Sequence, residues 1–219
     1  LHQYAVGMVF LPKKENQRTY CIGVFESEIE KQGLNILGWR KVPVNPEVVG
    51  SIAAQTEPYI MQAFIGRGAT DLSDHEFNIK LFSARKIAEH TISNSKLSEA
   101  SYFYLPSLST HTLIYKGLLI PEDIKGYYKD LSDPAVVTRL ALVHQRFSTN
   151  TAPSWSLAQP FRAIAHNGEI NTYKGNKNWM KVHEQEMSSP LFNDIENLKK
   201  KKKKGVSDSA ALDNVFELL

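Results

Sequence analysis

Cysteine is almost absent from this chain of 219 residues, in which Cys21 is the only thiol. A single cysteine excludes an internal disulfide and any structural zinc or iron–sulfur site that needs several thiolates from this chain. The chain also lacks an Asn-x-Ser/Thr acceptor for N-glycosylation. Together these absences predict an intracellular protein.

Long hydrophobic runs are absent as well. The longest, such as residues 140–143, span only a few residues, whereas a membrane-spanning helix needs about 18 or more. Hydrophobic residues make up 42% and charged residues 22%, which is typical of one folded domain and excludes a disordered chain. The chain opens at Leu1 with no initiator Met, basic leader or apolar signal core. We therefore expect no membrane partner, and we expect that processing or truncation removed what came before.

Excess positive charge is confined to one segment. The formal net charge is +3, and the six lysines from Lys199 to Lys204 account for more than all of it, since without them the net charge is −3. Like charges in such a run repel one another, and no aromatic or arginine residue accompanies them. We expect a mobile lysine-rich loop at about residues 197–205 and no nucleic-acid partner. The alternative, a nucleic-acid binder, predicts steeply salt-dependent binding that disappears when the run is deleted.

Hydrophobic periodicity predicts a mixture of strands and helices. Strands are expected at residues 4–11, 77–81, 102–105 and 112–119, with short strand or turn pieces at 34–40 and 42–44. Helices are expected at residues 20–31, 57–64, 83–96 and 209–219, and from Pro121 onward with Tyr127 and Tyr128 as anchors. Two further β-type runs lie at residues 138–149 and 161–166, on either side of a polar loop. Because these elements show no regular βαβ alternation, the predicted class is α+β.

Two polar features would lie at the ends of the last two β-type runs. Arg146 would end the first run beside the polar loop, which is a suitable place for a ligand-binding guanidinium. Asn167-Gly168 ends the second run, and its side-chain amide and backbone N–H are two donors that can converge on one oxygen. The dipeptide alone is more typical of a plain turn.

A metal hydrolase is an alternative that the histidines raise. His144, His166 and His183 are available, but none stands in a His-Glu-x-x-His or other metal-ligand spacing. His144 and His166 are better interpreted as strand-end residues, so no metal ligands are assigned.

Five motifs in a fixed order are far more specific than any of these residues alone. They are Arg-Phe-Ser-Thr-Asn-Thr from 146, Pro-Ser-Trp-x-Leu-Ala-Gln-Pro-Phe-Arg from 153, Ala-His-Asn-Gly-Glu-Ile-Asn-Thr from 165, Gly-Asn-x-Asn-Trp-Met from 175 and Ser-Asp-Ser-Ala-x-Leu-Asp-Asn from 207. With residues 4–12, 36–44, 56–65 and 108–119, they closely resemble the glutaminase domain of the large subunit of glutamate synthases. This is a class II glutamine amidotransferase domain, and the resemblance covers most of the chain.

The resemblance implies a fold and a set of site residues. The fold is the four-layer αββα sandwich of N-terminal nucleophile hydrolases, here incomplete at the N-terminus, with residues 1–219 forming part of the domain. Arg146 matches the residue that binds the α-carboxylate of L-glutamine, with Thr149 nearby, and Asp208 matches the acid that pairs with the α-ammonium. The Asn167 side chain and the Gly168 amide match the oxyanion hole.

One departure from the family concerns the nucleophile, which in the family is a cysteine at the mature N-terminus. This chain begins with Leu1, and Cys21 does not match the family position. Cys21 lies in a predicted amphipathic helix, where a lone cysteine is usually a small buried hydrophobe. We therefore expect this chain to be inactive by itself, and a catalytically inactive module that binds glutamine or glutamate stays open as the second hypothesis.

For the complete enzyme, the resemblance implies that glutamine is hydrolysed and that the ammonia converts 2-oxoglutarate to glutamate. The flavin-containing synthase domain of the same polypeptide would carry out that step, with a reductase subunit or domain as a further partner. FMN, an iron–sulfur cluster and NAD(P)H or ferredoxin are implied for those other parts, and no cofactor is expected in this chain. The same resemblance implies a cytoplasmic or plastid location.

Overall fold

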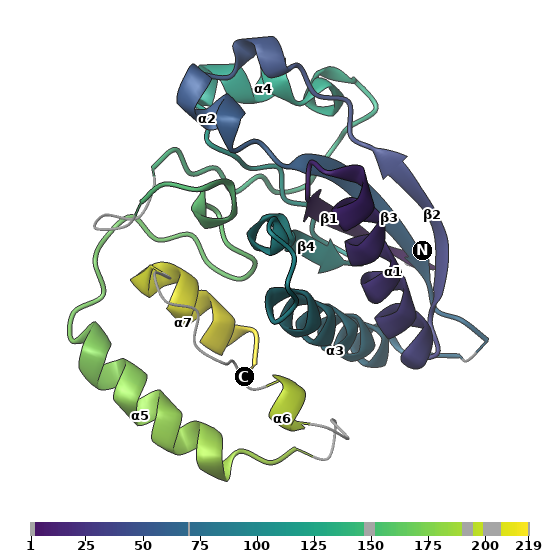
Figure 1. Ribbon diagram of the computed structural model, residues 1–219, viewed down its shortest axis with the longest axis vertical. Helices are drawn as coiled ribbons and strands as arrows, with labels where there is room; N and C mark the ends of the chain where they lie inside the picture. The colour runs from purple at the N-terminus through teal and green to yellow at the C-terminus, as the bar shows by residue number, and fades with distance from the viewer. Residues whose placement is uncertain (1–2, 70, 147–151, 190–194, 199–206, 219) are drawn as a thin grey trace.

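Four strands form one antiparallel sheet in the computed structural model, which describes residues 3–69, 71–146, 152–189, 195–198 and 207–218 (Figure 1). They lie in the order β2-β3-β1-β4, and they are β1 (Tyr4–Leu11), β2 (Asn35–Lys41), β3 (Tyr59–Gly66) and β4 (Tyr104–Ser109). β1 and β3 pair along their whole length, from Tyr4 opposite Gly66 to Leu11 opposite Tyr59. With the helices described below, this sheet confirms the predicted α+β class.

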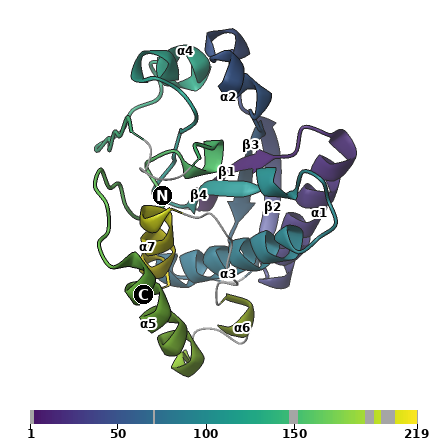
Figure 2. The ribbon, with the colours of Figure 1, turned by 60° about the vertical axis from the view of Figure 1, so that its left-hand side comes forward.

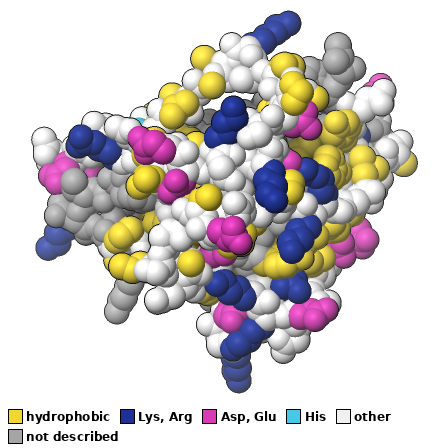
Figure 3. Space-filling view, turned by 90° about the horizontal axis from the view of Figure 1, so that it is seen from above, with side chains coloured by type: hydrophobic (Ala, Val, Ile, Leu, Met, Phe, Trp, Pro, Cys, Tyr) yellow, Lys and Arg dark blue, Asp and Glu magenta, His cyan; other side chains and the backbone are white. Residues whose placement is uncertain are grey.

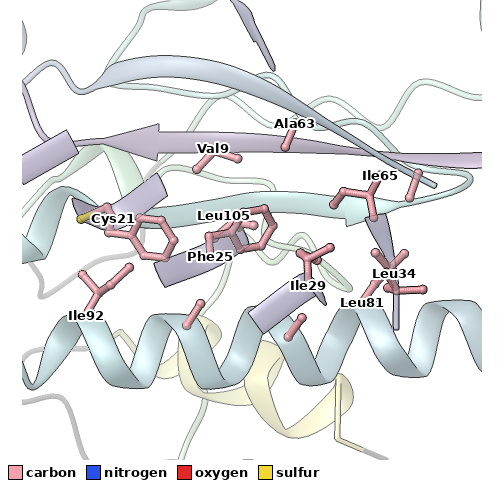
Figure 4. Close-up of a cluster of buried hydrophobic side chains, with 14 of the residues drawn as sticks. Val9, Cys21, Phe25, Ile29, Leu34, Ala63, Ile65, Leu81, Ile92 and Leu105 are labelled. Carbon is pink, nitrogen blue, oxygen red and sulfur yellow. The ribbon is translucent and has the colours of Figure 1, made fainter. Parts of the chain in front are cut away.

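Two long helices, α1 (Glu15–Lys31) and α3 (Asp74–Ser93), cover one face of the sheet (Figures 1 and 2). Side chains alternate between the two faces of a strand, so every second residue of β1 points toward these helices. The main core lies in this layer, which Figure 4 shows in close-up. Its fully buried side chains include Val9 and Leu11 from β1, Cys21, Phe25 and Ile29 from α1, and Phe77, Leu81, Ala84, Ala88 and Ile92 from α3.

The opposite face of the sheet carries a second, smaller core. Met8 and Phe10 of β1 pack there with Tyr127, Tyr128 and Trp155. The short helices α2 (Ser51–Gln55) and α4 (Ile124–Tyr127) lie on this side of the molecule. Both tyrosines are 0% exposed, which confirms their predicted role as anchors.

The last third of the chain forms three helices outside the sheet. They are α5 (Tyr173–Glu186), α6 (Ile195–Leu198) and α7 (Asp208–Phe216), and α7 confirms the helix predicted from residue 209 onward. α5 was not predicted, because its glycine, asparagine and lysine residues dilute the apolar pattern. Figures 1 and 2 both show α5 beside α7.

Two predictions in the first half of the chain were wrong. Residues 57–64 were expected to be helical, but β3 occupies Tyr59–Gly66 between β2 and β1. A strand with neighbours on both sides and cores on both faces is nearly continuously apolar, and such a run cannot be told from a short helix by periodicity. Residues 77–81 were expected to be a strand, yet α3 runs unbroken from Asp74. A capping box fixes its start, with Ser73 and Glu76 each bonding to the other's backbone.

Three β-type predictions in the second half were also wrong. Residues 112–119, 161–166 and the described part of 138–149 form no strand. Residues 138–146 are exposed except for the half-buried His144, and they pair with none of the described strands, so their backbone has no ladder to join. Residues 161–166 are held instead by side chains from elsewhere in the chain, which matters for the site described below.

Of the expected four-layer sandwich, the described residues contain one sheet, with α1 and α3 on one face and the short helices α2 and α4 on the side of the other. The lysine run at 199–204 lies outside the described residues, and α6 ends just before it, at Leu198. Within the described part of the chain, no helix combines the length and the apolar character needed to cross a bilayer. On the face seen in Figure 3, lysine and arginine side chains alternate with acidic ones and do not form a basic patch.

Candidate active site

An irregular segment at residues 159–170 carries Asn167 and Gly168, and side chains hold its backbone in place. The Gln159 side chain accepts a hydrogen bond from the His166 N–H at 2.8 Å and donates one to the His166 carbonyl. The Asp213 carboxylate accepts from the N–H groups of Ala163 and Ile164, at 2.7 and 3.2 Å. Because these bonds replace a strand ladder, the segment has a defined backbone path without being a strand.

Helix α7 brings Asp208 to the same segment. Ser207 caps the helix, its side chain accepting from the Ala210 N–H at 3.1 Å, so Asp208 lies in the first turn, where the helix dipole favours a carboxylate. Asp208 Oδ2 accepts from the Ile170 N–H at 2.7 Å, and Oδ1 accepts from the Ser209 N–H at 2.6 Å. Ser209 Oγ also lies 3.0 Å from His166 Nδ1. The structure thus joins the start of α7 to both sides of the Asn167-Gly168 pair.

Asn167 and Gly168 are exposed at this junction. Among the described residues, no hydrogen bond occupies the Asn167 side-chain amide or the Gly168 N–H. A Cβ atom on Gly168 would lie 3.2 Å from His166 Nε2, so a larger residue would require the imidazole ring that contacts Ser209 to shift by a few tenths of an ångström. Both donors are therefore accessible to a ligand from the solvent side.

Arg146 stands apart from this junction. Its backbone N–H donates to His144 Nδ1 at 3.1 Å, and its side chain is exposed. No hydrogen bond or ion pair joins its guanidinium to Asp208 or to any other described residue. Thr149, the remaining predicted site residue, lies outside the described residues. The structure thus brings Asn167, Gly168 and Asp208 together, and within the described part of the chain no partner occupies the Arg146 guanidinium.

A buried ionic cluster behind the junction was not predicted from the sequence. Arg162 donates to Glu89 at 2.6 Å and to the Leu105 carbonyl at 2.7 Å, and it lies 3.5 Å from Glu217. Arg85 donates to the same Glu217 at 2.7 Å. The cluster therefore ties α3 and β4 to segment 159–170 and to the residue that follows α7, and no local pattern could have predicted contacts between residues this far apart.

The charges of this cluster shift the pKa values of its members. Burial alone would raise the pKa of Glu217, but Arg85 and Arg162 lower it below the ordinary value. Burial, helped by the positive charge of Arg85, lowers the pKa of Lys86 to about 8. Burial alone would also lower the pKa of Arg162, but Glu89 and Glu217 raise it above the ordinary value. Glu217 and Arg162 therefore stay ionised in the interior.

Beside Asp208, a groove of about 860 Å³ runs between α5, α6 and α7. Its lining is mostly apolar and includes Trp179, Met180, Leu212 and Val215. Such a surface offers little to a small zwitterion, so within this groove the polar end at Asp208 is the part that suits an amino acid.

Cys21 is remote from the junction and unsuited to catalysis. It is 0% exposed in the main core, and burial raises its pKa to about 11, so the unreactive thiol form dominates at neutral pH. This confirms the interpretation of Cys21 as a small buried hydrophobe. Within the described residues, no group of three or more His, Cys, Asp or Glu side chains is arranged to hold a metal ion.

Comparison with known proteins places the chain in a family. The family model for class II glutamine amidotransferases matches residues 1–219, and this chain belongs to that family. It is 45% identical over 217 residues, 98% of this chain, to "Glutamate synthase [NADPH] large chain" of Bacillus subtilis (strain 168). It is 43% identical over 218 residues, 98% of this chain, to "Ferredoxin-dependent glutamate synthase 2, chloroplastic" of Arabidopsis thaliana. The chain spans 14% and 13% of the length of these two relatives, so it corresponds to one part of a glutamate synthase large chain.

Proposed function

We propose that this chain is the glutamine-binding and ammonia-releasing part of a glutamate synthase. The observation that carries the proposal is the junction itself: two unoccupied donors at Asn167 and Gly168 lie beside a carboxylate fixed at the start of α7. Free glutamine presents an amide oxygen, an α-ammonium and an α-carboxylate, and the chain offers a partner for each. The family match and the glutamate synthase relatives support the same assignment.

Each residue has a role that follows from its chemistry. The Arg146 guanidinium would bind the α-carboxylate through a bidentate pair, with Thr149 beside it, and the Asp208 carboxylate would bind the α-ammonium. Asn167 and Gly168 would donate to the amide oxygen as it gains negative charge during nucleophilic attack. The nucleophile would be the family's N-terminal cysteine, since Cys21 is buried in the main core. Attack by that thiol would release ammonia and leave an acyl-enzyme that water hydrolyses to glutamate.

The complete domain would have the four-layer αββα fold of N-terminal nucleophile hydrolases. In this fold a second sheet packs on the first, and residues 138–146, which are largely exposed and unpaired with the described strands, would contribute to it. The exposed apolar side chains Val137, Leu140 and Val143 support this placement, since a chain rarely leaves such a run in solvent.

The ammonia would be used by another part of the polypeptide to convert 2-oxoglutarate to glutamate. The names of the relatives specify NADPH or ferredoxin, and we propose one of these donors, together with FMN and an iron–sulfur cluster, for parts beyond this chain. The residues here do not fit an iron–sulfur cluster, because Cys21 is the only cysteine and is buried. We propose a location in the cytoplasm or a plastid. A module that binds glutamine without turnover is not favoured, because the relatives carry the names of enzymes.

Replacing Arg146 by alanine tests the assignment. In the complete polypeptide, Arg146→Ala should lower kcat/KM for glutamine by roughly 10-fold to 100-fold, the size expected for a lost charge-assisted pair. Glutamate formation from added ammonia should be unchanged, because only the glutaminase site uses Arg146. Steady-state rates with each nitrogen source provide the comparison, and the exposed Arg139 provides the matched control, Arg139→Ala. Equal loss with both nitrogen sources would contradict the proposal.

A further inference from the structure

We propose that Gln159 is a positioning residue for the oxyanion hole, because its side-chain amide holds the peptide group that precedes Asn167. This inference rests on the proposed glutaminase function and extends it to a residue outside the set that would contact glutamine.

The geometry at His166 carries the inference. Gln159 Oε1 accepts from the His166 N–H at 2.8 Å, and Nε2 donates to the His166 carbonyl. That carbonyl belongs to the peptide bond linking His166 to Asn167. A side chain that bonds to both backbone groups of one residue fixes that residue's orientation, much as a neighbouring strand would. The direction in which the chain enters Asn167 is thereby set by Gln159.

Anchors lie on both sides of the donor pair, and Gln159 supplies the one before it. After the pair, Ile170 is held through its N–H by Asp208. Before the pair, Gln159 holds His166 from a position that is only 5% exposed, so water competes poorly for its two hydrogen bonds. The His166 ring, 3.0 Å from Ser209 Oγ, fixes the side chain of the same residue but not its backbone.

A displaced oxyanion hole would affect turnover and spare binding. The two donors act mainly on the charge that develops in the transition state, so a shift in their position reduces kcat. Glutamine would still be held at its other end by Arg146 and Asp208. The expected signature of a Gln159 variant is therefore a fall in kcat with little change in KM.

The test replaces Gln159 by glutamate in the complete polypeptide. This change keeps the size of the side chain but sets a carboxylate oxygen against the His166 carbonyl. We expect the glutamine-dependent kcat to fall roughly tenfold to a hundredfold, as for a catalytic group displaced by a fraction of an ångström or more. KM for glutamine should stay within about twofold, and the rate with added ammonia should not change. The matched control is Gln62→Glu, the same substitution at a residue 4% exposed on β3, which should leave both rates unchanged.

A double-mutant cycle separates positioning from general destabilisation. In an Asn167→Ala background, Gln159→Glu should lower the glutamine-dependent kcat by a smaller factor than in the wild type. The reason is that one of the two donors positioned by Gln159 is already absent. Additive effects, an unchanged kcat or a rise in KM alone would overturn the role of Gln159. If Gln159→Glu also lowers the ammonia-dependent rate, Gln159→Met takes its place, since it removes both hydrogen bonds without adding charge. Equal loss of both activities in that variant would overturn the role as well.

The same experiment distinguishes this inference from the proposed function. If Asn167→Ala alone leaves glutamine turnover intact, the assignment of the oxyanion hole fails and the proposed function fails with it. If Asn167→Ala lowers kcat while both Gln159 variants behave like the wild type, the proposed function stands and only the role of Gln159 is overturned.

Discussion

Asn167→Ala is expected to lower the glutamine-dependent kcat of the complete polypeptide by roughly 100-fold to 1000-fold, the usual effect of removing one oxyanion-hole donor. The Asn167 side chain is exposed and unoccupied by any described hydrogen-bond partner, so its removal disturbs no internal contact in that part of the chain. Its loss should therefore raise the free energy of the transition state and so lower kcat. KM for glutamine should change little, and the rate with added ammonia should be retained.

Steady-state kinetics with glutamine and with ammonia measure this prediction. Asn16→Ala is the matched control, because Asn16 is an exposed asparagine in the first turn of α1, outside the segments that form the junction. It should leave all rates unchanged. A defect in Asn167→Ala that is confined to KM would place Asn167 in ground-state binding and would contradict its role as an oxyanion donor.

Arg162→Ala is expected to produce the largest loss of stability. The Arg162 side chain is only 9% exposed, and its removal would leave Glu89, Glu217 and the Leu105 carbonyl without its hydrogen bonds. Breaking a buried ion pair by removing one partner costs about 3–5 kcal/mol. Because Arg85 still pairs with Glu217 and Glu89, we expect the lower end of this range, about 3 kcal/mol. Since the cluster ties α7 and segment 159–170 to α3, the loss should concentrate in those elements.

Amide hydrogen exchange in the complete polypeptide locates this loss. A change of 3 kcal/mol or more corresponds to exchange at least about 100-fold faster in α7, because each 1.4 kcal/mol is a factor of ten. The exposed Arg139 again supplies the control, and Arg139→Ala should leave the exchange of α7 unchanged. Wild-type protection of α7 in Arg162→Ala would show that the cluster does not hold this helix in place.

Local patterns predicted the fold where apolar residues recur with a clear strand or helix period. β1 was predicted at its observed bounds, and α7 was predicted to within one residue of its start. Apolar residues at helical spacing also predicted α1, but from residue 20 instead of Glu15. Patterns failed where tertiary context decides the structure. β3 lies inside the sheet and lacks alternation, while the first turns of α3 place Phe77 and Leu81 among polar residues in a way that mimics a strand.

In the candidate site, too, sequence motifs identified the residues, whereas the tertiary contacts that position them were not predicted. Arg146, Asn167, Gly168 and Asp208 were assigned through motifs in a fixed order, and their catalytic roles remain predictions. The side-chain hydrogen bonds that hold the backbone of the site could not be predicted from the sequence. Gln159 and His166 are seven residues apart in an irregular segment, and Asp213 reaches back fifty residues to Ala163. No periodicity links such positions, since side-chain bonds to an irregular backbone obey no repeat.

The fate of the glutamine amide nitrogen tests the central claim most directly. The native, complete polypeptide is incubated with L-glutamine carrying ¹⁵N in its side-chain amide, and labelled ammonia and glutamate are measured by mass spectrometry. The account predicts that the label leaves glutamine as ammonia and, with 2-oxoglutarate and reductant supplied, appears in the amino group of new glutamate. If the label stays in glutamine while the polypeptide still makes glutamate from added ammonia, this chain is not a glutaminase.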